Sequence, residues 1–454
     1  MEEIQTIYII GIGGISLSAL ARILQEKNIE VLGSDLTENE MIEALIKDGF
    51  EIKIGSAHEF VKRADAVIYT SAVSNDNSDI ALAKKLGKRV LSRAELLGKI
   101  SEEYKTISIS GTHGKTTTTG MISNIFLIAG KDPSIHIGGI LNNINSNYRV
   151  GKGDYFITEA CEYKDSFLSL KSHIGVILNI KEDHLDYFRN IDNIFSSFQK
   201  FAQNISKNGI LVYNFDDFLA KKIKFNGKSV SFGLNELSDI CAKNIKEYQK
   251  GRYSFDVFYM GKEIGKINLP VYGFHNIYNA LASIAVGLCQ GIDFESIKTG
   301  IEEFKGIKRR FEFISNENGN LIIHDYAHHP DEITATLKTC RELGYQKVIL
   351  IFQPHTYSRT RDLYNEFLSC FQKADETWLL PIYPAREKPI KNITSKKICE
   401  DMRRSHFKSF YFSSFENCKK RILDKRRKDT LFAILGAGDI EKLAYDLKKT
   451  KKAN

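Results

Sequence analysis

The chain has 454 residues, 43% of them hydrophobic, which exceeds what one hydrophobic core usually supports, so we expect about three domains. An acidic start, no run of roughly 18 apolar residues and seven cysteines without C-x-x-C spacing argue against a secretory signal, a membrane span and a disulfide framework; we predict a cytoplasmic protein with no membrane partner. The net charge of +8 arises from 64 basic and 56 acidic residues spread along the chain, which suits an anionic substrate but does not indicate a nucleic-acid partner.

Short apolar runs alternate with amphipathic stretches along most of the chain, which predicts an α/β fold with parallel sheets and crossover helices. The first unit has a predicted strand over 7–10, a glycine turn, a helix over 16–27 and a strand over 31–33. Gly11 and Gly13, with Asp35 24 residues after Gly11, partly match the dinucleotide-binding fingerprint. Ser16 stands at the third glycine position, so the motif alone suggests NAD only weakly; the same geometry binds any pyrophosphate.

A second nucleotide-type opening follows, where a predicted strand over 106–110 enters G-T-H-G-K-T at 111–116. Its glycines allow backbone to approach phosphate, Lys115 can reach the β and γ phosphates, and the Thr116 hydroxyl can bind Mg²⁺. Ile109 replaces the first glycine of the strict P-loop consensus, and a helix is predicted to run on to a C-cap at Gly130. The pattern predicts binding of ATP with Mg²⁺.

Further oxygen and nitrogen ligands stand after two predicted strands of this second unit. The strand over 155–158 leads into Glu159 and Glu162, and the strand over 176–180 leads into E-D-H at 182–184. The carboxyl ends of parallel strands are where α/β sheets bind their ligands. A third unit is predicted from strands over 320–324, 347–352 and 430–435, which places the expected domains at 1–102, 103–311 and 312–454.

Taken together, the motifs closely resemble the Mur ligase family over nearly the whole chain. The blocks that carry this resemblance include GIGGISLSALA (11–21), GTHGKTTTT (111–119), EACEY (159–163), NIKEDHLDYF (179–188), GFHNIYNALA (273–282), KRRFE (308–312), HDYAHHPDEI (324–333), FQPHTYSRT (352–360) and GAGDI (436–440). The resemblance implies an N-terminal Rossmann-like domain for a UDP sugar, a central P-loop ATPase-type domain and a C-terminal Rossmann-like domain for an amino acid. It also implies an ATP-dependent ligase that adds L-alanine to the carboxylate of UDP-N-acetylmuramate through an acyl phosphate.

The resemblance also implies site residues, position by position. It places ATP at Gly111, Thr112, His113, Gly114, Lys115, Thr116, Thr117, Asn276, Asn279, Arg310 and Asp325. It places Mg²⁺, or a second metal, at Thr116, Glu159 and His184. It places the UDP sugar and the amino acid at Gly11, Gly13, Gly14, Ile15, Ser16, Asp35, Ser71, Tyr326, His328 and Arg359. The catalytic set would be Lys115, Glu159, His184, Arg310, Asp325 and His328, with His328 as a weak candidate for deprotonating the amine. His329 is expected instead at the start of a helix.

Two positions depart from the pattern of many family members, which carry aspartate where this chain has Cys161 and His324. A catalytic role for Cys161 is not expected, because the implied chemistry needs no thiolate.

Three other functions stay open at this point. A murein peptide ligase, which attaches a recycled tripeptide to the same nucleotide sugar, shares the phosphate loop. An NAD-dependent oxidoreductase would use the first glycine turn but would leave the second nucleotide loop without a role. A non-catalytic ATP switch would not need the block HDYAHHP with Arg359. The sequence leaves the oligomeric state open, a homodimer included.

Overall fold

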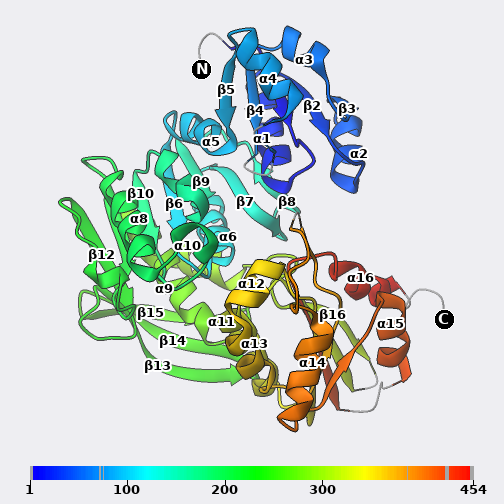
Figure 1. The fold of residues 1–454 in the computed structure, drawn as a ribbon. Helices are drawn as coiled ribbons and strands as arrows, with labels where there is room; N and C mark the ends of the chain where they lie inside the picture. Colours follow the sequence, from blue (N-terminus) through cyan, green and yellow to red (C-terminus); the bar gives the residue numbers. More distant parts are fainter. Residues whose placement is uncertain are drawn as a thin grey trace.

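The computed structural model describes residues 4–70, 73–74, 76–317, 319–385, 387–424 and 429–449 and has an α/β fold. It contains three sheets, one in each successive part of the chain, as the sequence pattern predicted (Figure 1). Among the described residues, no helix is long and apolar enough to cross a membrane.

The N-terminal sheet has five parallel strands in the order β3-β2-β1-β4-β5. Its strands are β1 (Thr6–Ile10), β2 (Glu30–Asp35), β3 (Glu51–Ile54), β4 (Ala66–Tyr69) and β5 (Arg89–Ser92), and its helices are α1 (Ile15–Glu26), α2 (Glu40–Lys47), α3 (His58–Arg63), α4 (Ser78–Lys85) and α5 (Arg93–Ser101). The βαβ unit predicted at the start of the chain is therefore present as β1, α1 and β2. Gly11, in the turn between β1 and α1, has a φ of +83° that glycine adopts without strain.

The central sheet has ten strands in the order β15-β14-β13-β12-β11-β10-β6-β9-β7-β8. Its strands are β6 (Lys105–Ser110), β7 (Ser134–Leu141), β8 (Ser146–Arg149), β9 (Tyr155–Glu159), β10 (Ile174–Ile177), β11 (Ile210–Asn214), β12 (Lys228–Gly233), β13 (Ile240–Gln249), β14 (Arg252–Tyr259) and β15 (Lys262–Asn268). Its helices are α6 (Lys115–Ile128), η1 (Tyr163–Ser169), α7 (Leu185–Phe188), α8 (Ile191–Gln203), η2 (Ala220–Lys222), α9 (His275–Cys289) and α10 (Phe294–Glu302).

The sequence pattern predicted parallel sheets, but this sheet is only partly parallel. The pairs β13–β14, β14–β15 and β7–β8 are antiparallel, and tight turns at Gly251 and Gly261, both with positive φ, connect the first two pairs. The strand predicted over 176–180 lies earlier, at β10, so that 178–184 form the loop at its carboxyl end. That loop carries part of the candidate site.

The C-terminal sheet has six strands in the order β16-β17-β21-β18-β19-β20. Its strands are β16 (Glu312–Glu317), β17 (Asn320–Asp325), β18 (Lys347–Phe352), β19 (Glu376–Leu379), β20 (Ser409–Tyr411) and β21 (Thr430–Leu435), and its helices are α11 (Pro330–Glu342), α12 (Tyr357–Asp362), α13 (Tyr364–Phe371), α14 (Ser395–Arg404), α15 (Phe415–Asp424) and α16 (Glu441–Lys449). The three predicted strands correspond to β17, β18 and β21, whereas the antiparallel β16 was not predicted.

The first two sheets share a hydrophobic core. Leu97 and Ile100 of α5 belong to the same buried cluster as Phe167 of η1 and Phe198 of α8. Gly98 lets α5 approach closely, because a Cβ there would stand 2.4 Å from the carbonyl oxygen of Ser169. The C-terminal sheet has separate clusters on its two faces. It meets the central sheet through α11 and α12 (Figure 1), and through polar contacts described below.

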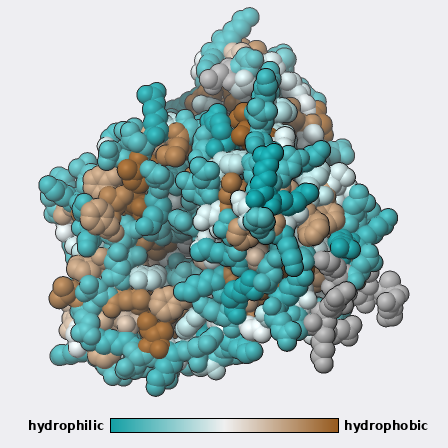
Figure 2. Space-filling model, turned by 60° about the horizontal axis from the view of Figure 1, so that its bottom comes forward, coloured by the Kyte–Doolittle hydropathy of each residue, from teal (hydrophilic) through white to brown (hydrophobic). Residues whose placement is uncertain are grey.

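Hydrophilic side chains predominate on the face of the molecule drawn in Figure 2, and the hydrophobic ones form separate patches around a hollow. On this face the exposed hydrophobic side chains are therefore separated by hydrophilic ones.

Candidate active site between the central and C-terminal sheets

The phosphate loop connects β6 to α6, at the carboxyl end of a parallel strand. Gly111 and Gly114 have φ values of +139° and +87°. A Cβ on Gly114 would stand 2.6 Å from Asn279 Oδ1, so glycine is required by both conformation and space. No side chain caps the first turn of α6. Its free N–H groups and helix dipole can therefore receive an anion such as a phosphate.

Lys115 is held inside this loop by a buried carboxylate. Its Nζ lies 2.9 Å from Glu162 Oε2 and donates hydrogen bonds to the carbonyl oxygens of Gly111 at 2.5 Å and Thr112 at 3.2 Å. Burial alone would lower the pKa of Lys115, but the negative charge of Glu162 keeps that pKa above its usual value. Lys115 therefore stays charged, as a lysine that binds phosphate must. Glu162 was noted in the sequence only as a strand-end carboxylate.

Asn179 supports the loop from the end of β10 and was not among the predicted site residues. Its Oδ1 accepts the His113 backbone N–H at 2.8 Å, and its Nδ2 donates to the His113 carbonyl at 3.0 Å. The only sequence signal for this role was its place at the start of the block 179–188, and the predicted strand over 176–180 included it.

The two asparagines of α9 form a relay beside the loop. Thr118 donates to Asn279 Oδ1 at 3.2 Å, Asn279 donates to Asn276 Oδ1 at 2.8 Å, and Asn276 donates to the Tyr272 carbonyl at 2.7 Å. Both asparagines are buried. Their spacing on one helix face, visible in the sequence, lets one amide orient the other.

Arg310 and Asp325 join the C-terminal sheet to the phosphate loop. Arg310 Nη2 donates to Thr116 Oγ1 at 3.4 Å. Asp325 accepts the backbone N–H groups of Phe311 at 3.0 Å and Ala327 at 2.8 Å. Burial raises the pKa of Asp325 to about 6, although Arg310 acts to lower it.

His113 makes a second contact between the loop and the C-terminal sheet. Its Nδ1 lies 3.3 Å from Glu332 Oε1 on α11. Burial would lower the pKa of His113, but Asp331 and Glu332 raise it to about 9. A cationic imidazole in the loop adds to the positive charge that Lys115 supplies.

These groups border one large cleft, of about 1230 Å³, between the central and C-terminal sheets. Of the residues predicted for ATP, the cleft brings together His113, Gly114, Thr116, Thr117, Asn276, Asn279, Arg310 and Asp325. The other three, Gly111, Thr112 and Lys115, lie behind them in the loop.

A smaller cavity, of about 370 Å³, also lies between the two sheets and is lined by His184 and Arg359. Arg359 Nη2 donates to Asp183 Oδ1 at 3.4 Å, and its Nη1 donates to the His355 carbonyl at 3.2 Å. Burial would raise the pKa of Asp183, but His184 and Arg359 hold that pKa below its usual value. Asp183 thus keeps Arg359 pointing into the cavity.

Three residues were predicted to hold a metal, and two of them flank the same pair of glycines. A Cβ on Gly138 would stand 3.1 Å from Glu159 Oε1, and one on Gly139 would stand 3.2 Å from Thr116 Cγ2. The Thr116 atom beside Gly139 is the methyl group; its hydroxyl oxygen accepts from Arg310 at 3.4 Å, and Glu159 Oε1 accepts the Gly138 N–H at 2.7 Å. A carboxylate and a hydroxyl are oxygen ligands of the kind that Mg²⁺ prefers. His184, the third of these residues, lines the smaller cavity, with its ring 4.5 Å from that of Tyr163.

The glycine turn of the N-terminal sheet faces the central sheet. Gly13 N donates to Asp35 Oδ2 at 2.9 Å, and Asn147 of the central sheet donates to the Ile15 carbonyl at 2.7 Å. Ser16 Oγ lies 3.0 Å from Nε2 of the buried His136, a residue the sequence did not single out. Gly14 is the N-cap of α1 and makes no side-chain cap. Ser71 lies outside the described residues.

The block 326–329 places its residues at the start of α11. His329 is the N-cap and Pro330 the first helical residue, which confirms the expected position of His329. Burial lowers the pKa of His328 to about 3, although Glu332 acts to raise it, so its neutral imidazole is a weak base for an amine proton. The ring of Tyr326 lies 5.4 Å from that of His328 and under the Arg310 guanidinium.

Neither of the two departures from the family pattern adds a charge. Burial raises the pKa of Cys161, so its thiol stays protonated, as a non-catalytic cysteine should. His324 is fully buried on β17, and its Nδ1 lies 2.9 Å from the Ile434 carbonyl.

We expect His324 to make the protein sensitive to acid. Burial lowers the pKa of His324 to about 4, from 6.5, so unfolding takes up a proton as the pH falls from 6.5 towards 4. The free energy of unfolding is therefore at its full value above pH 6.5. It decreases by up to about 3 kcal/mol at pH 4. Denaturant unfolding should show a smaller decrease in His324→Asn, whose amide can still donate to Ile434. The exposed His406→Asn is the control, and an equal decrease in all three proteins would contradict this role.

Comparison with known proteins places three family models in succession along the chain. "Mur ligase family, catalytic domain" matches residues 6–105, "Mur ligase middle domain" matches 109–287, and "Mur ligase, glutamate ligase domain" matches 309–438. A UDP-N-acetylmuramate–L-alanine ligase of Caldanaerobacter subterraneus is 44% identical over 97% of this chain and 96% of its own. The ligase of the same name from Clostridium acetobutylicum is 44% identical over 96% of each chain.

Solved structures agree with these relatives. The UDP-N-acetylmuramate-alanine ligase of Thermotoga maritima has a TM-score of 0.84 at 28% identity and covers 99% of this chain and 100% of its own. A murein peptide ligase of Psychrobacter arcticus has a TM-score of 0.74 at 22% identity and covers 99% of each chain, which shows a shared fold.

Proposed function

This chain belongs to the Mur ligase family, and we propose that it joins L-alanine to the carboxylate of UDP-N-acetylmuramate at the expense of ATP. The observation that carries the proposal is the match at 44% identity to ligases of this name over nearly the whole chain. The site geometry is consistent with it, because a phosphate loop and a small acceptor cavity both open between the central and C-terminal sheets.

A carboxylate cannot be attacked directly by an amine at neutral pH, because oxide is a very poor leaving group. The γ phosphate of ATP therefore passes to the muramate carboxylate and gives an acyl phosphate and ADP. Lys115, held charged by Glu162, neutralises the charge of the transferring group, and the free N–H groups of α6 bind the phosphates. The neutral L-alanine amine then attacks the acyl carbon, the carbon–oxygen bond to phosphate breaks, and phosphate and one proton from the nitrogen leave.

Mg²⁺, when bound, would neutralise phosphate charge, and Thr116, Glu159 and His184 are the residues that would hold it. Arg359, aimed into the smaller cavity by Asp183, would bind the carboxylate of the incoming L-alanine. The turn from Gly11 to Ser16, with its free helix N-terminus, would bind the UDP pyrophosphate.

We propose that each of the three sheet-containing parts of the chain binds one substrate. Residues 1–102 bind the UDP sugar, 103–311 bind ATP, and 312–454 bind the amino acid. Because His113 contacts Glu332 across the cleft between the last two parts, movement of the C-terminal part would open the ATP site. All seven cysteines are free, which fits the cytoplasm as the proposed location.

The test is phosphate release from ATP by the purified protein in the presence of UDP-N-acetylmuramate. We expect release that requires both the nucleotide sugar and L-alanine. A preference for the tripeptide L-Ala-D-Glu-diaminopimelate over L-alanine would instead identify a murein peptide ligase. Release that depends on neither acceptor would contradict both.

A further inference from the structure

Two histidines and an aspartate meet where the phosphate loop faces α11. One ring nitrogen of His113, one of His329 and a carboxylate oxygen of Asp331 all lie within 4.8 Å of one another. The two rings are 5.2 Å apart, and His113 Nε2 lies 3.9 Å from Asp331 Oδ2. His113 belongs to the central part of the chain and the other two to the C-terminal part, so the cluster spans the ATP cleft.

Each of the two imidazoles has a ring nitrogen that makes no hydrogen bond to any described residue. In the part of the chain that the structure describes, Nε2 of His113 and Nε2 of His329 are buried and have no hydrogen-bond partner. His329 as a whole is only 6% exposed. A buried polar nitrogen without a partner is unfavourable, and it marks a place where a ligand would be stabilised.

We propose that His113, His329 and Asp331 bind a transition-metal ion of the Zn²⁺ type and that this ion bridges the phosphate loop and α11. Two imidazoles and one carboxylate form the ligand set of open zinc sites, with a fourth position left for water or a phosphate oxygen. Glu332, 3.3 Å from His113 Nδ1, supplies the carboxylate that commonly orients a metal-bound imidazole. The ion would take the place of the proton that His113 holds beside these acids.

The required rearrangement is small. Zinc bonds of about 2.0–2.2 Å place tetrahedral ligand atoms about 3.3 Å apart, so atoms now within 4.8 Å of one another must approach by up to about 1.5 Å. Asp331 can supply its own part of this movement, because its side chain is 63% exposed, and the two imidazole rings must also move closer together. The site differs from that of Thr116, Glu159 and His184, where two of the three ligands are oxygens of the kind Mg²⁺ prefers.

The consequence for turnover rests on the proposed function. An ion shared by the loop and α11 would hold the C-terminal part against the ATP site and slow the opening that releases products. Zinc at low concentration should therefore inhibit phosphate release.

The experiment is a titration of the chelator-treated full chain with Co²⁺, whose visible absorption reports tetrahedral coordination. We expect one Co²⁺ per chain, displaced by Zn²⁺. His329→Asn keeps an N-cap but removes an imidazole, and Asp331→Asn removes the carboxylate; each should weaken Co²⁺ binding by about tenfold or more. His406→Asn, an exposed histidine changed in the same way, should bind Co²⁺ like the unaltered protein.

Binding that survives both substitutions, or an absorption band of cobalt bound to thiolate, would overturn the proposal. The titration does not use ligase activity, so its failure is distinguishable from failure of the proposed function. Where the ligase is active, the ratio of phosphate release with and without zinc connects the two. Zinc inhibition equal in His329→Asn and the unaltered chain would rule out the bridge as its cause.

Discussion

Replacement of Lys115 by Met should lower the rate of phosphate release by about a thousandfold, because it removes the cation that neutralises the transferring phosphate. The same change leaves Glu162 buried without its partner at 2.9 Å, which should destabilise the fold by about 3–5 kcal/mol. Both effects can be measured, by steady-state phosphate release and by denaturant unfolding.

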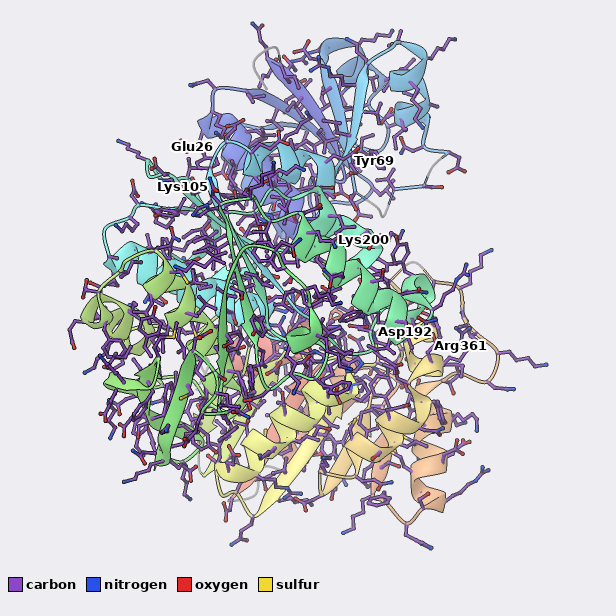
Figure 3. The ribbon with its side chains drawn as sticks, turned by 90° about the vertical axis from the view of Figure 1, so that its left-hand side faces the viewer. Glu26, Tyr69, Lys105, Asp192, Lys200 and Arg361 are labelled. Carbon is purple, nitrogen blue, oxygen red and sulfur yellow. The ribbon has the colours of Figure 1, made fainter. Side chains whose placement is uncertain are left out.

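A second substitution separates the two effects. In Lys115→Met with Glu162→Gln the unpaired charge is gone, so stability should largely return while activity stays low. Lys105→Met is the matched control, since Lys105 is an exposed lysine on β6, the strand that enters the loop (Figure 3). Recovery of activity in the double variant would contradict the assignment of Lys115 to phosphate transfer.

Replacement of Arg359 by Ala should lower kcat/KM for L-alanine by about a hundredfold and leave the KM for ATP nearly unchanged. Among the described residues that line the smaller cavity, Arg359 is the only arginine, and a charge-assisted bond to a carboxylate contributes about 1.5–3 kcal/mol. The measurement is phosphate release with L-alanine and ATP varied separately. Asp183→Asn should have a smaller effect in the same direction, because it only loosens the orientation of the guanidinium.

Arg361, two residues further along α12, is the control for this experiment. Its side chain is 54% exposed and pairs with Asp362, and it is labelled in Figure 3. Arg361→Ala should behave like the unaltered protein. An equal loss of affinity for L-alanine and ATP in Arg359→Ala would indicate a structural role at the interface instead.

The α/β class and the family could be recognised from the sequence, because local patterns carry them. Hydrophobic runs bounded by turn residues located β17, β18 and β21 to within about one residue. Glycines before a helix, as at Gly11 and Gly111, mark backbone positions that glycine adopts without strain, and φ is positive at both.

Other elements could not be predicted, because local pattern does not determine them. The strands β13, β14 and β15 form antiparallel hairpins at one edge of an otherwise largely parallel sheet. A period of two in hydrophobicity is the same for parallel and antiparallel strands, so only the pairing partner decides their direction. β16 likewise pairs antiparallel with β17, the next strand along the chain.

By itself the sequence determined the types of chemical group available: a phosphate loop with a lysine, carboxylates after two strands, paired asparagines on one helix face, and a histidine-rich turn. Only the tertiary structure decided which groups meet. Arg359 contacts Asp183 across 176 positions of the chain, and His113 contacts Glu332 across 219. Such pairs depend on how separate sheets pack against each other, and no local propensity encodes that packing.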